Sequence, residues 1–382
     1  MISYKFNRNS YINTHRDAWV EVNLDSIEKN ILEFKKYLAK DSKLFAVVKA
    51  DAYGHGAVMI APILLASGVD FLGVSSIDEG LQLREANIKA PILVLGAVPV
   101  WSFDWAATND ISVSVFSDEH IEACKQTFEK TNIKPKVHVK IDTGMNRIGV
   151  KPQHAVEFIQ KIQKCDFIEL EGVFTHFAMA EDMDLSNQQY KEFNDVVQNI
   201  DESGLLIHCC NTSAVVSYSD YKYNMARVGI GIYGLQPDLT IGTKKPNIMP
   251  VMSLRGRITN IHEANVAEGV SYSRTFETRR VTKIATIPIG YADGVPRALS
   301  NKIYGILHGK KIKQVGNITM DQMMFDVTDC DDLTLNEGDT ITLIGQDGEE
   351  YISVDEWAKI LNTIHYEITC SLRVRLPRVY TR

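Results

Sequence analysis

The sequence contains little cysteine and no long hydrophobic run. Six of its 382 residues are cysteine, and none of them forms a CxxC pair. We therefore expect reduced thiols in a cytoplasmic protein rather than a disulfide framework. Because no run of 18 apolar residues occurs, the sequence predicts no helix that spans a membrane.

The first 17 residues, MISYKFNRNSYINTHRD, lack the apolar stretch of a signal peptide. They are polar and show no periodicity. We expect residues 1–17 to form a polar tail, or a linker that joins the chain to a further domain of a larger membrane protein.

An excess of positive charge is also absent. The chain has 41 Lys and Arg against 48 Asp and Glu, a net charge of −7, which argues against a surface for nucleic acid or anionic membranes. Its ten histidines show no HxH, HExxH or Cys/His spacing, so no metal site is expected. Hydrophobic residues make up 45% and charged residues 23%, which is typical of a globular protein with a large core.

Strand-like and helix-like patterns alternate through the first two thirds of the chain. Eight such repeats predict an α/β fold, a (β/α)8 TIM barrel over residues 18–246. The predicted strands are Leu44–Ala50, Phe71–Ser75, Ile92–Gly96, Ile111–Phe116, Lys136–Ile141, Leu170–Thr175, Leu206–Cys210 and Arg227–Tyr233.

After Pro250 the pattern changes to strand-like runs divided by Gly, Asn and Asp. The runs are VMSLRGRITNI, VTKIATIPI, IYGILHG, KIKQVGNI, MMFDVTD and TITLIG. They predict a mainly β C-terminal domain over residues 247–382. The segment KKPNIMP (244–250) is the expected connector.

Lys49 ends the first predicted barrel strand, within LFAVVKADAYGHG. Burying a lysine is costly because its ammonium loses hydration. At the carboxyl end of a barrel strand it would face the catalytic rim, and a lowered pKa would suit Schiff-base chemistry. In an arbitrary VVKA sequence, however, a lysine that extends its ammonium into solvent is the commoner arrangement.

Polar and cationic residues follow four more of the predicted strands. Because the carboxyl ends of barrel strands meet at one rim, with a phosphate site after the last two strands, we expect one site there. The candidates besides Lys49 are Asp142, Thr143, Met145, Asn146 and Arg147 after the fifth strand, His176 after the sixth, Asn211 and Thr212 after the seventh, and Arg227, Gly229 and Ile230 in the eighth.

The string AVVKADAYGHG resembles the cofactor-lysine motif of the alanine racemases, which use pyridoxal 5′-phosphate (PLP). HVKIDTGMNRIGV, GVFTHFA, HCCNTSA and MARVGIGIYGL resemble further motifs of that family, in the same order and spacing. The resemblance runs from about Trp19 to Pro377. It implies a cytoplasmic homodimer with shared active sites that interconverts L- and D-alanine and supplies D-alanine for peptidoglycan.

The resemblance implies two bases. Lys49 would hold PLP and act on one face of the substrate, and Tyr272, in GVSYSRTF, would act on the other face from the second subunit. A tyrosine, with a pKa near 10, needs positive charge nearby, and His176 and Arg227 occupy the positions of a family histidine and arginine. By itself, His176 is more often a strand-end histidine, and Arg227 is as readily part of a barrel salt bridge.

Arg227 also distinguishes between reactions. The family points this arginine at the pyridine nitrogen of PLP. An arginine stays protonated, so it does not give the ring a proton, and the cofactor is a weaker electron sink. This favours rapid reprotonation, and therefore racemisation, over decarboxylation or transamination.

The remaining implied roles belong to the cofactor, the substrate and one modified lysine. Cofactor contacts are implied for Tyr53, Asn211, Thr212, Gly229, Ile230 and Tyr366, and substrate contacts for Arg147, Tyr291, Met320 and Asp321. Lys140 matches a lysine that is carbamylated in some members and braces the arginine at 147. The family often has Ser where this chain has Thr212 and Cys where it has Thr319, and the second change lies close to the substrate.

Alanine and serine both remain candidate substrates. Serine racemases of the vancomycin-resistance type resemble this family but tend to have a smaller polar residue at Tyr366, whose ring limits the space beside the substrate methyl. The polar tail would also fit a catalytic domain of such a membrane-bound protein. A PLP decarboxylase of this architecture would need a carboxylate at the ring nitrogen, and a PLP carrier would lack the β domain and Tyr272.

Overall fold

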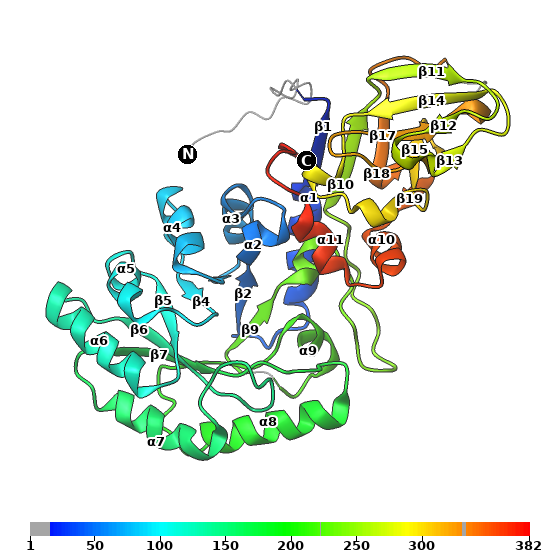
Figure 1. Ribbon diagram of the computed structural model, residues 1–382. Helices are drawn as coiled ribbons and strands as arrows, with labels where there is room; N and C mark the ends of the chain where they lie inside the picture. The colour runs from blue at the N-terminus through cyan, green and yellow to red at the C-terminus, as the bar shows by residue number, and fades with distance from the viewer. Residues whose placement is uncertain (1–15, 222, 331–333) are drawn as a thin grey trace. The chain divides into compact units, whose positions relative to one another are not determined.

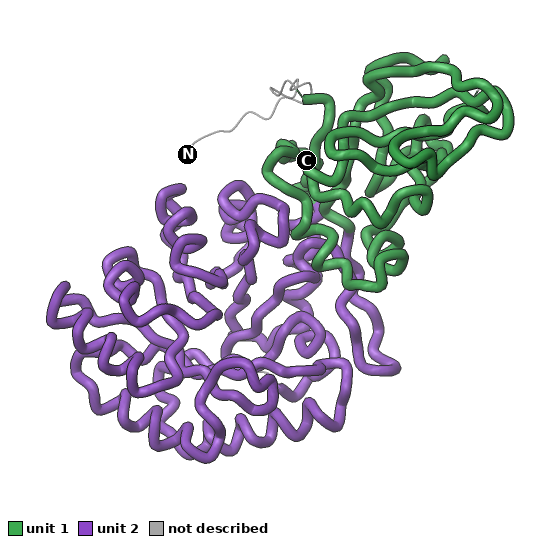
Figure 2. Tube along the Cα trace, in the orientation of Figure 1, with its two compact units in different colours: residues 1–25, 250–382 green, residues 26–249 purple. Residues whose placement is uncertain are grey.

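The computed structural model describes residues 16–221, 223–330 and 334–382. They form two units (Figure 2), one of residues 26–249 and the other of the described residues up to Asp25 together with residues 250–382. The division after Met249 falls within the expected connector. Residues 1–15 of the predicted tail lie outside the described residues.

Residues 26–249 contain a parallel barrel (Figure 1). In the described part of this unit, eight strands pair in the order β8-β7-β6-β5-β4-β3-β2-β9. They are β2 (Lys43–Val47), β3 (Phe71–Val74), β4 (Ile92–Val94), β5 (Ser112–Val115), β6 (Lys136–Lys140), β7 (Glu169–Phe174), β8 (Leu206–His208) and β9 (Met225–Val228). The eight predicted strands and the barrel class are confirmed.

Arg227 contributes to the closure of the barrel between β8 and β9, as does Asn224, whose side chain bonds the backbone of Leu205 and Ile207. The backbone N–H of Arg227 donates to the carbonyl of Cys210 at 3.1 Å. Its side chain donates to the carbonyls of His208 and Cys209 at 3.0 and 2.9 Å. One side chain therefore joins the two strands at which the sheet meets itself.

Most predicted strands extend past the observed ends, and the largest differences are in β2 and β9. β2 ends at Val47, so Lys49 and Ala50 lie beyond it, and the backbone at Ala50 is left-handed with φ 51°. β9 ends at Val228, so Gly229 and Ile230 lie in the turn after it rather than in the strand. In both places an apolar sequence continues past the last ladder hydrogen bond, and composition alone does not mark that point.

Helices follow most of the strands (Figure 1). They are α1 (Leu24–Lys35), α3 (Ala57–Ala66), α4 (Ile77–Glu85), α5 (Phe103–Thr108), α6 (Asp118–Thr131), α7 (Pro152–Gln163), α8 (Met183–Val197) and α9 (Thr212–Ser217). Several begin at capping side chains, as sequence rules predict. Asp182 accepts from the N–H of Leu185 at 2.9 Å, for example.

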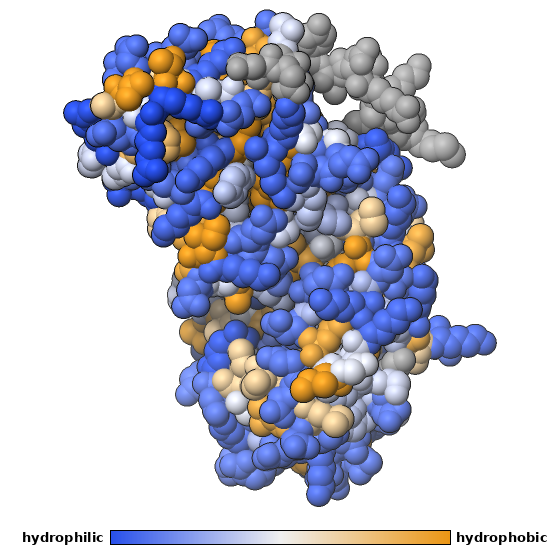
Figure 3. Space-filling view, turned by 90° about the vertical axis from the view of Figure 1, so that its right-hand side faces the viewer, coloured by the Kyte–Doolittle hydropathy of each residue, from blue (hydrophilic) through white to orange (hydrophobic). Residues whose placement is uncertain are grey.

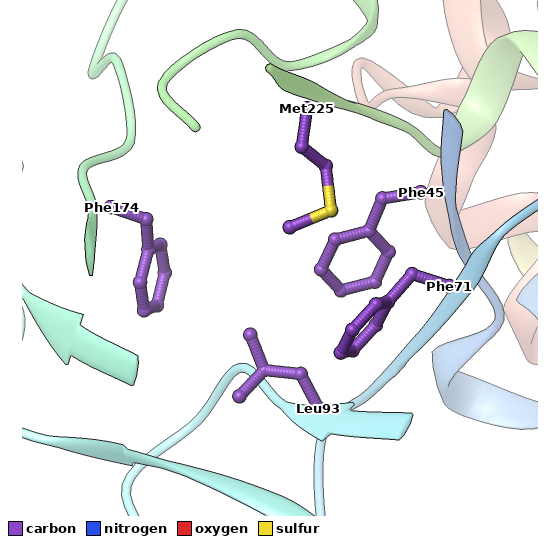
Figure 4. Packing of buried hydrophobic residues seen from close by; sticks show 5 residues of the cluster. All are labelled: Phe45, Phe71, Leu93, Phe174 and Met225. Carbon is purple, nitrogen blue, oxygen red and sulfur yellow. The ribbon is translucent and has the colours of Figure 1, made fainter. Parts of the chain in front are cut away.

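Part of the barrel interior is filled by a cluster of apolar side chains. Figure 4 shows Phe45, Phe71, Leu93, Phe174 and Met225, each from a different strand, with their side chains turned toward one another. All five are at most 2% exposed. The rings of Phe45 and Phe71 lie 5.2 Å apart, a spacing typical of packed aromatic pairs.

The second unit is mainly β, as predicted. Its described residues form a ten-stranded sheet with the path β11-β14-β17-β16-β15-β18-β10-β1-β20, to which β19 is added beside β18, and a two-stranded sheet of β12 and β13. The strands are β1 (Ala18–Asn23), β10 (Met252–Arg257), β11 (Asn260–Ala264), β12 (Gly269–Val270), β13 (Phe276–Glu277), β14 (Thr282–Ile287), β15 (Tyr304–Leu307), β16 (Lys310–Val315), β17 (Met323–Asp326), β18 (Thr340–Asp347), β19 (Glu350–Ile352) and β20 (Arg378–Thr381). Two helices, α10 (Val354–Leu361) and α11 (His365–Ser371), complete the unit.

Strand β1 differs from the expected domain division, which assigned residues 18–246 to the barrel. It pairs antiparallel with β10 and parallel with β20, so it belongs to the mainly β unit. The barrel offers it no partner at its first strand, because β2 is already paired with β3 and with β9.

The space-filling view in Figure 3 shows one face of the molecule. Hydrophilic side chains predominate there, and hydrophobic ones form small separate groups. Among the described helices, none combines the length and the apolar character needed to cross a membrane.

Candidate active site

The backbone that follows Lys49 is left-handed. Lys49 begins α2 (Lys49–Tyr53), in which the four residues Ala50 to Tyr53 have φ between 51° and 55°. Each such residue costs about 1–2 kcal/mol for an L-amino acid. Strain of this kind persists where surrounding contacts impose it, most often at functional sites.

Carboxylates hold this turn at both ends. Glu79 in α4 accepts from the N–H of Ala50 and from the N–H of Ser75, each at 2.7 Å. Asp51 accepts from the N–H of Ala57 at 2.7 Å. These bonds satisfy backbone donors at the turn and so fix Lys49 just beyond the carboxyl end of β2.

Tyr233 supports the same turn with its ring and its hydroxyl. Its Oη donates to the carbonyl of Val47 at 2.8 Å. Its ring stacks on His55, with 4.6 Å between the centroids, and lies 5.0 Å from the ring of Tyr53. The aromatic group therefore places the Tyr53 side chain as well as the Lys49 backbone.

Tyr53, Thr212 and Gly229 meet at one part of the rim. A Cβ atom at Gly229 would lie 2.7 Å from Tyr53 Oη, so any other residue here would displace the tyrosine hydroxyl. The N–H of Gly229 donates to Thr212 Oγ1 at 2.9 Å. Ile230 follows at the start of η2 (Ile230–Tyr233), and Asn211 caps α9. Hydroxyls and backbone N–H groups around a bare glycine suit a phosphate dianion.

Arg227 is 3% exposed, and both of its terminal nitrogens donate to the barrel. Nη2 donates to the carbonyls of Thr175 and Cys209 at 2.8 and 2.9 Å. Nη1 donates to Nδ1 of His208 at 2.7 Å. Its Nε–H has no hydrogen-bond partner in the described part of the chain. Burial lowers the pKa of Arg227 to about 10, so the guanidinium stays charged at neutral pH.

His176 lies beside this guanidinium. Its Nδ1 is 3.3 Å from Nη2 of Arg227. An arginine only donates, so Nδ1 is the acceptor and the proton of the neutral imidazole is on Nε2. Burial, together with the charges of Arg227 and Lys140, holds the pKa of His176 well below its usual value. His176 is therefore a neutral donor at physiological pH.

Lys140 in β6 is 2% exposed, and its Nζ donates to the carbonyl of Ile141 at 2.6 Å. Burial, together with the positive charges of Arg227 and Arg147, lowers its pKa to about 7. The neutral, nucleophilic amine of Lys140 is therefore accessible near neutral pH.

The loop after β6 is organised by Asp142. Its Oδ1 accepts from the N–H of Asn146 at 2.9 Å, and its Oδ2 lies 2.7 Å from Nζ of Lys151. Thr143 is buried, and its hydroxyl lies 2.8 Å from that of Thr175. This network fixes the loop that carries Arg147, whose side chain is exposed.

The other candidates lie in the mainly β unit. Tyr272 begins η3 (Tyr272–Arg274) and is 71% exposed. The residues on either side, Ser271 and Ser273, have φ of 65° and 61°. Asn317 holds this strained turn, because its carbonyl accepts from Ser271 Oγ and its Nδ2 donates to the carbonyl of Tyr272, both at 2.7 Å. The tyrosine is thus presented by a fixed backbone.

Tyr291 and Met320 occupy adjoining turns of this unit. The N–H of Tyr291 donates to the carbonyl of Thr319 at 3.0 Å. Both side chains remain substantially exposed, at 38% and 52%. Asp321 is paired with Arg375 at 2.7 Å, so its carboxylate already has a cationic partner.

Tyr366 lies in the first turn of α11. Its ring stacks on that of His365, with 4.8 Å between the centroids. Ser371 at the other end of α11 donates to the carbonyl of Gly294 at 3.0 Å. The helix that carries Tyr366 is therefore attached to the turn that follows Tyr291.

The structure thus gathers the predicted residues into two groups, one in each unit. It adds residues that the sequence did not indicate, chiefly Glu79 and His208. Nothing in the sequence distinguishes Glu79 from other acidic residues on helix surfaces. His208 is the first residue of the motif HCCNTSA. Its position within a predicted strand is the feature that could have indicated a side chain facing the barrel interior, because alternate residues of a strand point to opposite faces.

The sequence matches known families over both units. Residues 22–237 match the family described as alanine racemase, N-terminal domain, and residues 251–380 match alanine racemase, C-terminal domain. "Alanine racemase 1" of Oceanobacillus iheyensis is 41% identical over 375 residues, which covers 97% of this chain and 99% of that protein.

Solved structures agree with the sequence matches. The alanine racemase of Clostridium difficile 630 superposes with a TM-score of 0.91 at 36% identity and covers 97% of each chain. The alanine racemase of Bacillus anthracis with bound L-Ala-P superposes with a TM-score of 0.88 at 36% identity, over 97% of this chain and 96% of that one.

The lowered pKa of His176 predicts a pH dependence of stability. Between its native pKa and its unfolded value near 6.5, the unfolded chain binds a proton that the native chain does not, so stability falls as the pH falls. One such group changes the free energy of unfolding by about 1.4 kcal/mol per pH unit. In His176→Gln, the loss of stability between pH 7 and pH 5, measured by urea denaturation, should be smaller, because the contribution of this histidine to that loss is removed.

The control is His154→Gln, which removes an exposed histidine from α7. It should leave the slope unchanged. An equal slope in His176→Gln and the unaltered protein would contradict the assigned neutral state.

Proposed function

The chain belongs to the alanine racemase family and is an isomerase, and we propose that it interconverts L- and D-alanine with PLP bound at Lys49. The observation that carries the proposal is the arrangement of Arg227 and His176 at the barrel rim. It combines a charged donor on β9 with a neutral one after β7, and β9 pairs with β2, the strand that Lys49 follows. A pair of opposed proton acceptors is the further requirement for racemisation, and Tyr272 supplies the second.

Two features support PLP as the cofactor. The close backbone approach at Gly229, beside Tyr53 Oη, suits a phosphate that accepts from the hydroxyls of Tyr53 and Thr212 and from the N–H of Ile230. The Nε–H of Arg227, without a partner in the described residues, suits a pyridine nitrogen. We add Asn211 and Tyr366 to the cofactor contacts on the sequence resemblance alone.

When bound, PLP withdraws electrons from the substrate and makes the α-hydrogen acidic. The residues around it determine which reaction results. Arg227 keeps its own proton, because its pKa of about 10 lies far above that of a pyridine. It therefore orients the ring without strengthening the withdrawal of electrons, and rapid return of a proton to the α-carbon is favoured.

Lys49 and Tyr272 are proposed as the bases on the two faces of the α-carbon. Lys49 Nζ takes or returns the proton on one face. On the other face, Oη of the partner subunit's Tyr272 does so, with His176 Nε2–H donating to that oxygen and Arg227 supplying nearby positive charge. A hydrogen-bond donor and a nearby positive charge both favour a tyrosine oxygen as a proton acceptor. This assignment requires a homodimer in which each subunit completes the other's site.

Substrate contacts are proposed for Arg147, Tyr291, Met320 and Asp321. Arg147 suits the substrate carboxylate or the phenolic oxygen of the cofactor. The ring of Tyr366 limits the space for the substrate side chain and so favours alanine over serine. The D-alanine formed would serve peptidoglycan synthesis.

A chiral assay with L-alanine and L-serine, run on the unaltered protein and on Tyr272→Phe, tests the function. We expect racemisation of alanine in preference to serine. Tyr272→Phe should keep its PLP content but lose about 10²–10⁴-fold in kcat in both directions, because a positioned acid–base group contributes about that much.

Tyr304→Phe is the matched control, since Tyr304 in β15 is 48% exposed in the same unit. It should behave like the unaltered protein. Near-normal racemisation by Tyr272→Phe would contradict the two-base scheme, and equal or faster turnover of serine would contradict the substrate assignment.

Lys140 is proposed to be carbamylated. A neutral amine adds to CO2 to give a carbamate and releases one proton. The modification replaces a buried positive charge, which Arg147 and Arg227 repel, by a negative charge that both arginines stabilise. A carbamate at Lys140 would also brace Arg147 for its substrate role.

NMR spectra of protein equilibrated with ¹³C-labelled bicarbonate test this modification. We expect one carbamate resonance in the unaltered protein and in the control Lys151→Met, and none in Lys140→Met. The proposal is wrong if the unaltered protein shows no such resonance, or if the resonance persists in Lys140→Met.

A further inference from the structure

Behind Arg227, three side chains form a continuous hydrogen-bonded chain through the barrel interior. Nη1 of Arg227 lies 2.7 Å from Nδ1 of His208. Nε2 of His208 lies 3.0 Å from Nδ1 of His138, and Nε2 of His138 lies 3.0 Å from Oε2 of Glu171. The chain thus runs from β9 through β8 and β6 to β7.

Arg227 at one end and Glu171 at the other determine which ring nitrogen carries the proton in each of the two histidines between them. Arg227 only donates, so Nδ1 of His208 must accept. Burial, followed by the charge of Arg227, holds the pKa of His208 well below its usual value, so this neutral ring carries its proton on Nε2. Nδ1 of His138 then accepts, and its Nε2–H donates to Glu171.

Glu171 is ionised at the far end. Burial raises its pKa, but the hydrogen bond from His138, the hydroxyl of Ser112 at 2.6 Å and the charge of Lys136 outweigh that effect, and its pKa is lowered. All the bonds point the same way, from the guanidinium to the carboxylate, so each polarises the next.

Phenylalanine rings pack against both imidazoles. His208 and His138 are both 0% exposed. Phe174 stacks on His208, with 4.8 Å between the centroids, and Phe71 meets His138 edge-on at 5.8 Å. Both phenylalanines belong to the cluster in Figure 4. Two imidazoles in such surroundings are costly compared with apolar side chains of the same size, so packing alone does not account for them.

We infer that His208 and His138 are positioning residues. Through their hydrogen bonds, the negative charge of Glu171 stabilises the positive charge of Arg227, so that the guanidinium keeps its proton. This inference rests on the proposed function, because it concerns the arginine assigned to the ring nitrogen of PLP. With the charge of Glu171 removed, Arg227 becomes more acidic and shares its proton with that nitrogen more readily. The ring then withdraws electrons more strongly, and turnovers are diverted from racemisation to transamination.

The diverted reaction has a product of its own. The amino group of alanine passes to the aldehyde carbon of PLP, which is reduced and gains the proton lost from the α-carbon. The α-carbon is oxidised to the ketone of pyruvate, with its oxygen supplied by water, and Lys49 is released as the free amine. Pyruvate therefore counts each diversion.

The first test needs neither cofactor nor variant. Long-range ¹H–¹⁵N spectra of the cofactor-free protein, labelled at histidine, report which ring nitrogen carries the proton. We expect the Nε2–H form for both His208 and His138, with no Nδ1–H form. A proton on Nδ1 of either histidine would overturn the inference.

The second test compares Glu171→Gln with the unaltered holoenzyme. The amide oxygen of the glutamine can still accept the hydrogen bond from His138. The substitution therefore removes the negative charge and keeps the bond. We expect the pyruvate formed per racemisation event to rise severalfold. An unchanged ratio of pyruvate to racemised alanine would mean that the hydrogen-bonded histidines serve barrel packing only. This result would overturn the inference.

His120→Gln is the control for a buried histidine of the same unit. His120 is 7% exposed, stacks on Phe103 and accepts from the N–H of Phe116, outside the chain. Its pyruvate ratio should not change. If the unaltered protein fails to racemise alanine, the proposed function fails and takes this inference with it. If it racemises and Glu171→Gln leaves the ratio unchanged, the inference alone fails.

Discussion

The buried positive charge of Arg227 is the constraint on which the rest of the site depends. It contributes to the closure of the barrel between β8 and β9, and burial together with its charge lowers the pKa values of His176, His208 and Lys140. The same guanidinium therefore helps determine both where the strands meet and which neighbouring groups are neutral. A lysine at this position would not make the same set of carbonyl bonds, because its single ammonium lacks the planar fork.

Local strain is concentrated where the two proposed bases stand. Lys49 is followed by four left-handed residues, and Tyr272 lies between two serines with positive φ. In each case hydrogen bonds from neighbouring segments hold the backbone, from Glu79 in the first and Asn317 in the second. Groups that exchange protons with a substrate must be placed accurately, and a strained but fully supported turn does so without relying on a flexible loop.

The sequence predicted the barrel, its eight strands and the mainly β unit, because apolar runs and turn residues are local signals. It also identified Lys49, His176 and Arg227 as rim residues, because position at a strand end follows from strand assignment. It did not predict the left-handed turn after Lys49, which depends on Glu79 of a neighbouring helix, or the pairing of β1 with β10. The chain through His208 and His138 was equally out of reach, since it joins side chains far apart in sequence.

The central claim is that Arg227 donates to the cofactor ring without giving up its proton. It is tested most directly by the ¹⁵N NMR signal of PLP labelled at the ring nitrogen and bound to the protein. The account predicts the signal of a hydrogen-bonded but unprotonated pyridine nitrogen across neutral pH. The signal of a protonated pyridinium would contradict it.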